Sequence, residues 1–87
     1  MEKKTSFLVC KTEFDSPELR AVFEWLKSKG WSAKEKSWDI VGSQEITVYE
    51  LSNGHIKADL VLETYEGAML FTPQEYAHIF YEIRIPQ

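Results

Sequence analysis

Residues 46–63 read ITVYELSNGHIKADLVLE, and this stretch decides the fold. Hydrophobic and polar residues alternate on both sides of Asn53-Gly54, a pair typical of a two-residue type I′ turn. Such alternation places one face of each strand in a core and the other in water. In the second strand the expected core residues are Ile56, Ala58, Leu60 and Leu62, and the expected water-facing residues are Lys57, Asp59, Val61 and Glu63. The stretch therefore predicts an antiparallel hairpin with one covered face.

Upstream of this hairpin, the sequence predicts a strand followed by a helix. Residues 6–11 are rich in β-forming side chains, and Asp15 or Ser16 can cap a helix whose first residue is Pro17. The expected buried stripe has helical spacing and consists of Leu19, Val22, Phe23 and Leu26. Gly30 follows where a left-handed C-cap is needed, and Trp31 can close that cap.

Downstream, a third strand and a final helix are predicted. Glu66-Gly67 marks a turn, residues 68–71 suit a short strand, and Thr72-Pro73-Gln74-Glu75 combines a capping box with proline at the first helical position. One face of that helix would carry Tyr76, Ile79, Phe80 and Ile83. Residues 79–85 are also strongly β-forming, so an extended end before Pro86 is the alternative.

Residues 32–43 are compatible with two structures. Ser32 and Glu35 form a capping box that favours a short helix, whereas residues 38–41 would also serve in a strand. We favour the short helix. The sequence then predicts an α+β, two-layer single domain over residues 1–87, with an antiparallel β-meander packed against two helices in the order β-α-(short α)-β-β-β-α.

Length and composition set the class of protein. With 87 residues and 44% hydrophobic side chains, the chain can form one small core. Cys10 is the only cysteine, so no intramolecular disulfide can form, which favours a reducing compartment. The first residues lack a leader-like pattern, and no apolar run approaches the ~18 residues of a membrane span. We expect a cytoplasmic protein that does not enter membranes.

The chemically versatile residues are scattered. His55, His78 and Cys10 fall in three different predicted elements, so neither a metal site nor a nucleophile with its base is indicated. Asp59 and Glu63 share a strand face, but an open sheet face offers little of the desolvation that tunes catalytic carboxylates. We therefore expect no catalytic residue, no metal and no cofactor.

Charge is sorted along the chain. Residues 1–36 carry eight Lys and Arg against six Asp and Glu, whereas residues 37–87 carry two against eight. Opposite poles on so short a chain can orient a charged partner as it approaches. This asymmetry favours a binding protein. Its oligomeric state stays open, because the edges of the predicted sheet could pair with a second copy.

Acidic side chains on the sheet, with a tyrosine between them, suit a basic protein partner, because charge speeds encounter and an aromatic ring anchors the complex. The expected contacts are Glu45, Tyr49, Asp59, Glu63 and Glu66. The predicted function is a non-enzymatic inhibitor, of immunity-protein or anti-CRISPR type, that masks a basic surface of a nucleic-acid-handling protein such as a nuclease.

A small RNA- or single-stranded-DNA-binding domain is the alternative. Residues 25–38 interleave tryptophans with lysines, a composition that stacks bases while holding phosphates. The expected contacts are Lys27, Lys29, Trp31, Lys34 and Lys36. The predicted order after Ser16, a helix, a three-stranded meander and a helix, is similar to that of a double-stranded RNA-binding domain, which implies RNA binding. That family opens its second helix with a lysine cluster, whereas this chain has Pro73-Gln74-Glu75.

Overall fold

The computed structural model describes residues 4–11, 17–64 and 66–83. Its elements are β1 (Lys4–Cys10), α1 (Pro17–Ser28), β2 (Ser32–Val41), β3 (Gln44–Ser52), β4 (Lys57–Glu63), β5 (Gly67–Pro73) and the 3-10 helix η1 (Gln74–Ile83). The chain is thus a small α+β domain with two helices, as the sequence predicts, but its antiparallel sheet has five strands, one more than the predicted order contains.

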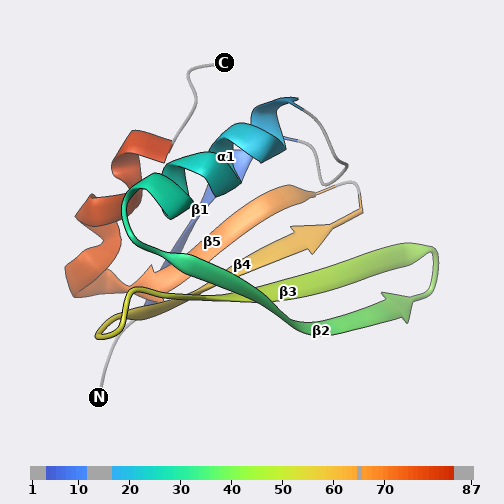
Figure 1. Cartoon of the computed structure of the whole chain (residues 1–87). Coiled ribbons are helices and arrows are strands. Elements are labelled where there is room, and N and C mark those ends of the chain that lie inside the picture. Colours follow the sequence, from blue (N-terminus) through green and yellow to red (C-terminus); the bar gives the residue numbers. More distant parts are fainter. Residues whose placement is uncertain (1–3, 12–16, 65, 84–87) are drawn as a thin grey trace.

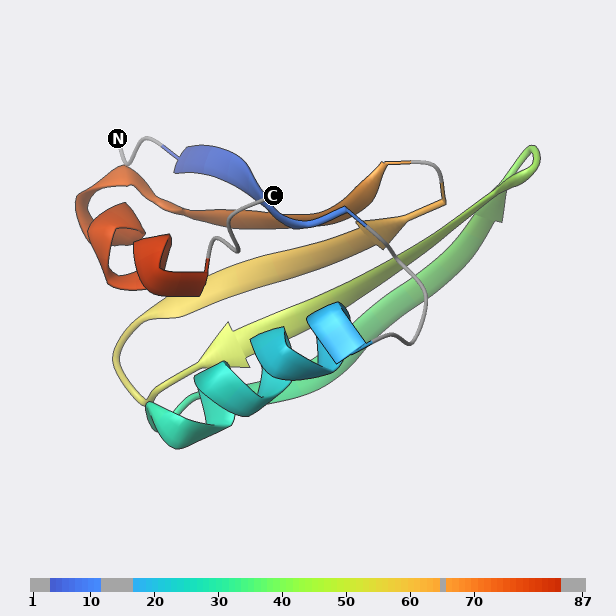
Figure 2. The ribbon, with the colours of Figure 1, turned by 90° about the horizontal axis from the view of Figure 1, so that it is seen from above.

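The strands form one sheet in the order β1-β5-β4-β3-β2. β2 to β5 are a meander in which each strand pairs with the next, and β1 adds to the far side of β5. Both helices lie on the same face of the sheet, α1 against β1 and β2 and η1 against β1 and β5 (Figures 1 and 2). Among the described residues, the other face carries no helix, and no helix is long and apolar enough to cross a membrane.

Residues 32–41 form the strand β2, so the predicted short helix was wrong. Ser32 is not a helix cap: it lies opposite Ser52, and its hydroxyl donates to the Ser52 carbonyl at 3.2 Å. A capping box is a local signal, whereas β2 gains a ladder with β3 that runs from Ser32 to Val41. Four strands therefore separate the two helices, one more than in the order that is similar to a double-stranded RNA-binding domain.

The predicted C-cap of α1 is confirmed. Gly30 has a φ of 86°, and its amide donates to the Lys27 carbonyl at 3.1 Å. The Trp31 amide donates to the Leu26 carbonyl at 2.9 Å, and both of these side chains are buried in the core. These two bonds define a Schellman motif. The cap predicted at Asp15 or Ser16 lies outside the described residues.

We expect Gly30→Ala to lower the free energy of unfolding by about 1 kcal/mol, because a Cβ is disfavoured at positive φ. A Cβ at this position would meet no atom within 4 Å, so the loss is conformational rather than steric. Urea denaturation followed by far-UV circular dichroism measures it. An unchanged midpoint would contradict the role of Gly30 in this cap.

The β3–β4 connection is longer than the predicted two-residue turn. Ser52 lies opposite Lys57, which leaves a four-residue loop. The Asn53 Oδ1 accepts hydrogen bonds from the amides of His55 and Ile56 at 3.1 and 2.9 Å. Asn53 thus organises the loop through its side chain, as an Asx turn does, rather than through a type I′ backbone.

The core lies between the sheet and the two helices. Its fully buried large side chains include Leu51, Leu60 and Leu70 from the sheet, Leu26 from α1 and Phe80 from η1. The helix that was predicted to begin at Pro73 is present as a 3-10 helix that begins at Gln74. Thr72 does not cap it, because Thr72 and Pro73 still belong to β5 and pair with β1. Phe80 packs this helix on the core through Trp31, at 4.8 Å between ring centroids. An extended end beyond Ile83 lies outside the described residues.

Candidate binding surfaces

The sheet face without helices, called here the open face, carries a row of apolar side chains. Residues that pair across neighbouring strands share a face. One such row runs from β1 through β5 and β4 to β3 and consists of Leu8, Met69, Val61 and Val48. Phe71 and Ile46 lie on the same face in the neighbouring rows. Leu8 and Phe71 are 39% and 37% exposed, and the other four are half-buried. These six residues form an apolar band across the open face.

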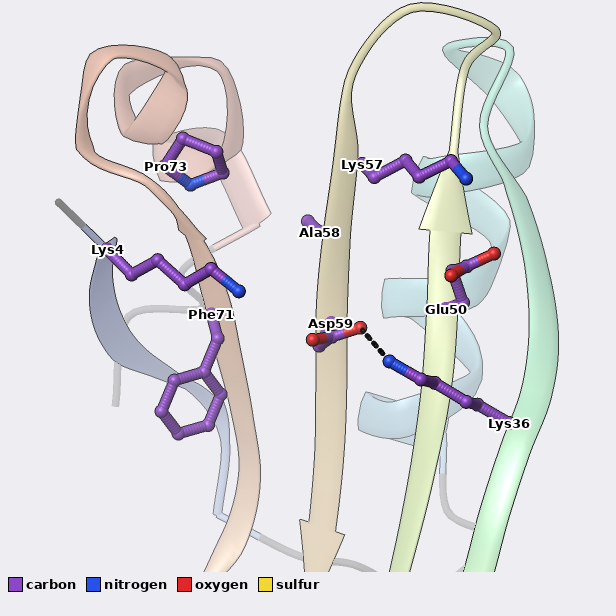
Figure 3. A pocket seen from close by; sticks show the side chains of 8 residues that line it. All are labelled: Lys4, Lys36, Glu50, Lys57, Ala58, Asp59, Phe71 and Pro73. Carbon is purple, nitrogen blue, oxygen red and sulfur yellow. Dashed lines mark ion pairs between the residues drawn. The ribbon is translucent and has the colours of Figure 1, made fainter. Parts of the chain in front are cut away.

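Lysines gather at one end of the open face. They surround a shallow pocket of about 170 Å³, whose charged lining is Lys4, Lys36, Lys57, Glu50 and Asp59. Figure 3 shows these side chains on the side of the strands that faces away from the helices. Lys36 Nζ lies 3.9 Å from Asp59 Oδ1, a long contact between partly exposed groups and therefore a weak ion pair.

Carboxylates gather at the opposite end. Glu63 and Asp39 both lie in the row of Ile46, and Glu66 is exposed in the turn between β4 and β5. Lys11, which follows β1, is at the same end on the outer edge of the sheet. Across β4 and its neighbours, the open face is therefore basic at one end and acidic at the other.

The five predicted partner contacts do not form one face. Asp59 and Glu63 lie on the open face and Glu66 in the adjoining turn. Tyr49 lies opposite Leu60 and points toward α1, where its ring packs edge-on against Phe23 at 5.3 Å. The expectation that Tyr49 shares a face with Asp59 was therefore wrong.

Glu45 is also on the helix side of the sheet, opposite Ile40. The residue that does lie opposite Asp59 is Glu50, which the sequence reasoning missed. The sequence did contain a signal for it. Side chains alternate between the two faces of a strand, so hairpin loops of two residues, as predicted, and of four residues, as observed, both place Glu50 on the face of Asp59.

The end of the β2–β3 hairpin, residues 38–45, is called here the hairpin tip. It extends beyond the other strands (Figures 1 and 2), and β2, paired with β3, is an edge strand of the sheet as far as the described residues go. Trp38, Ile40 and Val41 are 54%, 57% and 55% exposed. They are three of the six large hydrophobic side chains that are exposed among the described residues.

Hydrogen bonds fix the hairpin tip. The Trp38 indole Nε1 donates to Glu45 Oε1 at 2.8 Å, so the ring is held although it is exposed. The Glu45 amide donates to Thr64 Oγ1 at 2.9 Å, and the Thr64 amide donates to the Glu45 carbonyl at 3.1 Å. These bonds continue the sheet past the last residue of β4 and support the base of the hairpin tip.

The residues of the predicted nucleic-acid surface are divided between two sides of the molecule. Trp31 is 6% exposed and packs against Phe80, so its ring is not accessible for base stacking. Lys27 is on the last turn of α1, and Lys29, just after it, lies 5.9 Å from the Trp25 ring. Lys34 and Lys36 are on the opposite layer of the molecule, where Lys34 lies opposite Glu50. The structure does not join these residues into one strip.

The chemically versatile side chains lie in three different elements of the fold. Cys10 is buried in the core, whereas His55 is exposed in the β3–β4 loop and His78 is exposed on η1. Within the described ranges, no three His, Cys, Asp or Glu residues are grouped so that they could hold a metal ion.

Comparison of the chain with known protein families, with curated proteins and with solved structures gives no match. The assignment of a function therefore depends on the surfaces of this chain alone.

Proposed function

We propose that the chain is a non-enzymatic protein-binding module that docks through its hairpin tip on a basic surface of a nucleic-acid-handling protein. The observation that carries this proposal is the exposure of Trp38, Ile40 and Val41 on an edge strand at the end of the molecule. Large apolar side chains at a protruding edge expose the protein to unwanted pairing unless a partner covers them.

Trp38 has the properties of an anchor residue. Tryptophan is enriched among the residues that dominate binding energy at protein interfaces. The bond to Glu45 holds the indole in one orientation before binding, which lowers the entropy lost when the complex forms. The exposed edge of β2 adds unpaired backbone groups that an extended segment of the partner can meet.

Charge favours a basic partner. The charged residues of the hairpin tip are Asp39 and Glu45, and the exposed Glu66 lies at the same end of the sheet. With a net charge of −4, the chain attracts a basic surface during encounter and is repelled by the phosphates of nucleic acids. Masking of a basic, nucleic-acid-binding surface would make the chain an inhibitor of immunity-protein or anti-CRISPR type.

We expect Trp38→Ala to reduce partner capture at least about tenfold, because loss of an interface anchor costs about 2 kcal/mol or more. The immobilised protein is incubated with a lysate of its source cells and washed at rising salt, and the retained chains are identified by mass spectrometry. The unmodified protein should retain a basic nucleic-acid-handling protein that elutes as salt rises.

Tyr81→Ala is the matched control, because Tyr81 is also 54% exposed but lies on η1. It should capture the partner as the unmodified protein does. Equal capture by the Trp38 variant would show that the hairpin tip is not the docking surface. Recovery of nuclease-sensitive RNA or DNA instead of a basic protein would favour the alternative function through Lys27, Lys29, Lys34 and Lys36.

A further inference from the structure

We infer that the free edge of β2 pairs with β2 of a second copy of this chain, antiparallel and about a two-fold axis at the bulge in this strand. The two sheets then form one continuous sheet of ten strands, five from each copy. This inference goes beyond the proposed function, because it concerns the backbone edge of β2 and needs no other protein. It rests on the exposure of the strand, the direction of its backbone groups and the side chains that the pairing brings together.

The strand β2 is exposed along its whole length. All ten of its residues are exposed, whereas each of the other four strands contains at least one buried residue. Ala33 and Glu35 are exposed although they lie on the helix side, opposite Leu51 and Tyr49, so α1 leaves this edge uncovered. Within the part of the chain that the structure describes, β3 is the one strand that pairs with β2. Such an edge is a template for pairing with another chain.

Hydrogen bonds around β3 show which backbone groups of β2 point outward. The amide and the carbonyl of Glu45 both bond to Thr64, so they point away from β2. Ile40 lies opposite Glu45 in a non-hydrogen-bonded pair, and its own backbone groups therefore point toward the free edge. The direction alternates along β3: the Ser52 carbonyl, seven residues after Glu45, points toward β2 and accepts from the Ser32 hydroxyl.

The same alternation gives outward backbone groups to four residues of β2, which are Ala33, Glu35, Trp38 and Ile40. They lie opposite every second residue of β3, so they are evenly spaced along the edge, and their midpoint lies opposite Val48. A two-fold axis perpendicular to the sheet at this midpoint pairs Ala33 with Ile40, and Glu35 with Trp38, of the other copy. Each pair then exchanges two hydrogen bonds, as in a regular antiparallel ladder.

The bulge in β2 lies at this axis. Lys36 is the extra residue between Glu35 and Ser37, and a bulge ordinarily disrupts pairing with a further strand. Here the two bulges oppose each other, so the ladders on both sides of the axis stay in phase. Like charges are not brought together, because Lys36 leans over its own sheet, where its Nζ lies 3.9 Å from Asp59 Oδ1 (Figure 3).

The faces of the side chains agree with this register. Lys36 and Ser37 are both on the open face, so the alternation along β2 is mirrored about the bulge. The register centred there keeps paired side chains on one face along the whole strand. Shorter registers centred on Lys34 or Asp39 also match the faces, but each sets that charge against its own copy, which is destabilising.

The pairing brings complementary side chains together. Lys34 and Asp39, both on the open face, lie opposite each other, and symmetry gives this contact twice. On the helix side, Ala33 lies beside Ile40 of the other copy, a side chain that is 57% exposed in the single chain. The charges and the apolar side chains therefore both favour a second copy.

The Ile40 amide shows how the unpaired edge is satisfied locally. It donates to Oδ1 of the neighbouring Asp39 at 2.8 Å, a side-chain substitute for a strand. In the dimer the Ala33 carbonyl of the other copy accepts this bond, and the Asp39 carboxylate turns to Lys34 of that copy. Pairing thus keeps the amide bonded and adds a contact between opposite charges.

The interface is a small one. An edge of ten residues buries less than the roughly 800 Å² on each partner that a standard interface buries, so we expect a reversible dimer with a roughly micromolar Kd. An extended segment of another protein that reached the same edge would displace the second copy.

Sedimentation velocity of the purified chain over a range of concentrations tests the edge. The unmodified chain should pass from one copy to two as its concentration rises. Ala33→Pro removes an amide that points to the free edge and no bond to β3, and it should weaken dimerisation at least about tenfold. Ala33→Val is the matched control, because it keeps the amide and should dimerise as the unmodified chain does. Circular dichroism and urea denaturation establish that both variants fold.

Charge reversal tests the register. Lys34→Glu and Asp39→Lys should each weaken dimerisation about tenfold, because like charges then face each other twice. An equimolar mixture of the two variants pairs opposite charges at both contacts, so its dimers should recover the original affinity. Any effect of either substitution within its own chain persists in the mixture, so a recovery comes from contacts between the copies.

Three results would overturn the inference. The unmodified chain could remain a single copy at the highest soluble concentration. Ala33→Pro and Ala33→Val could dimerise equally, which would exclude the edge of β2. The mixture of charge variants could associate no more tightly than either variant alone, which would exclude the register that sets Lys34 against Asp39. Because these measurements use the purified chain alone, such a failure leaves the docking of a partner on the hairpin tip to be decided by the capture experiment.

Discussion

Replacing Phe80 with alanine is expected to remove about 3–5 kcal/mol from the free energy of unfolding, the range for a large aromatic side chain deleted from a packed core. Phe80 is fully buried, and its ring packs against Trp31. A domain of this size has a total stability of about 5–15 kcal/mol, so the variant should lie near the limit of folding at 37 °C.

Tyr81→Ala provides the comparison on the same helix. Tyr81 is 54% exposed and contacts Phe7 edge-on at 5.6 Å, so its loss should cost about 1 kcal/mol. Thermal and urea denaturation measure the free energy of unfolding of both variants. If the two substitutions cost the same, η1 does not pack on the core through Phe80 and the described position of this helix is wrong.

The second large effect is expected at Gly67, where Gly67→Ala should cost about 2–4 kcal/mol through backbone strain and a steric clash. The φ of Gly67 is 91°, and a Cβ there would lie 2.5 Å from the Cys10 carbonyl oxygen and 3.1 Å from that of Lys11. Both atoms belong to the backbone, so neither can move aside as a flexible side chain could. The β1–β5 pairing would have to shift.

Gly30→Ala isolates the conformational part of this cost. Gly30 also has a positive φ, but a Cβ there meets no atom within 4 Å. Urea denaturation gives the free energy of unfolding of each variant. The extra loss in Gly67→Ala therefore reports the steric clash with β1 at the turn before β5. Equal destabilisation would show that this close approach does not exist.

The elements that depend on local signals could be predicted from the sequence. The α1 helix, its Schellman cap at Gly30 and the positions of β3, β4 and η1 follow from spacing and turn residues. The β2 strand could not be predicted in this way, because Ser32 and Glu35 give a local helix signal. The competing ladder with β3 comes from residues up to 20 positions away in the chain.

The candidate sites were harder to predict for a related reason. Tyr49 was assigned to the face of Asp59, although cross-strand pairing places it beside Leu60 and under α1. The exposure of Trp38 depends on how far α1 extends over the sheet, which no residue pattern in the sequence states. Glu45 was predicted as a contact, but its bond to the Trp38 indole is visible only in the structure.

Site-specific photocrosslinking tests the central claim, that the partner docks on the hairpin tip, most directly. A photoreactive amino acid is placed at Ile40 and, in a second protein, at Glu24, which is exposed on α1. Irradiation in the lysate should crosslink a basic nucleic-acid-handling protein from position 40 and not from position 24. A crosslink to that protein from position 24 alone, or to nucleic acid from position 40, would contradict the account.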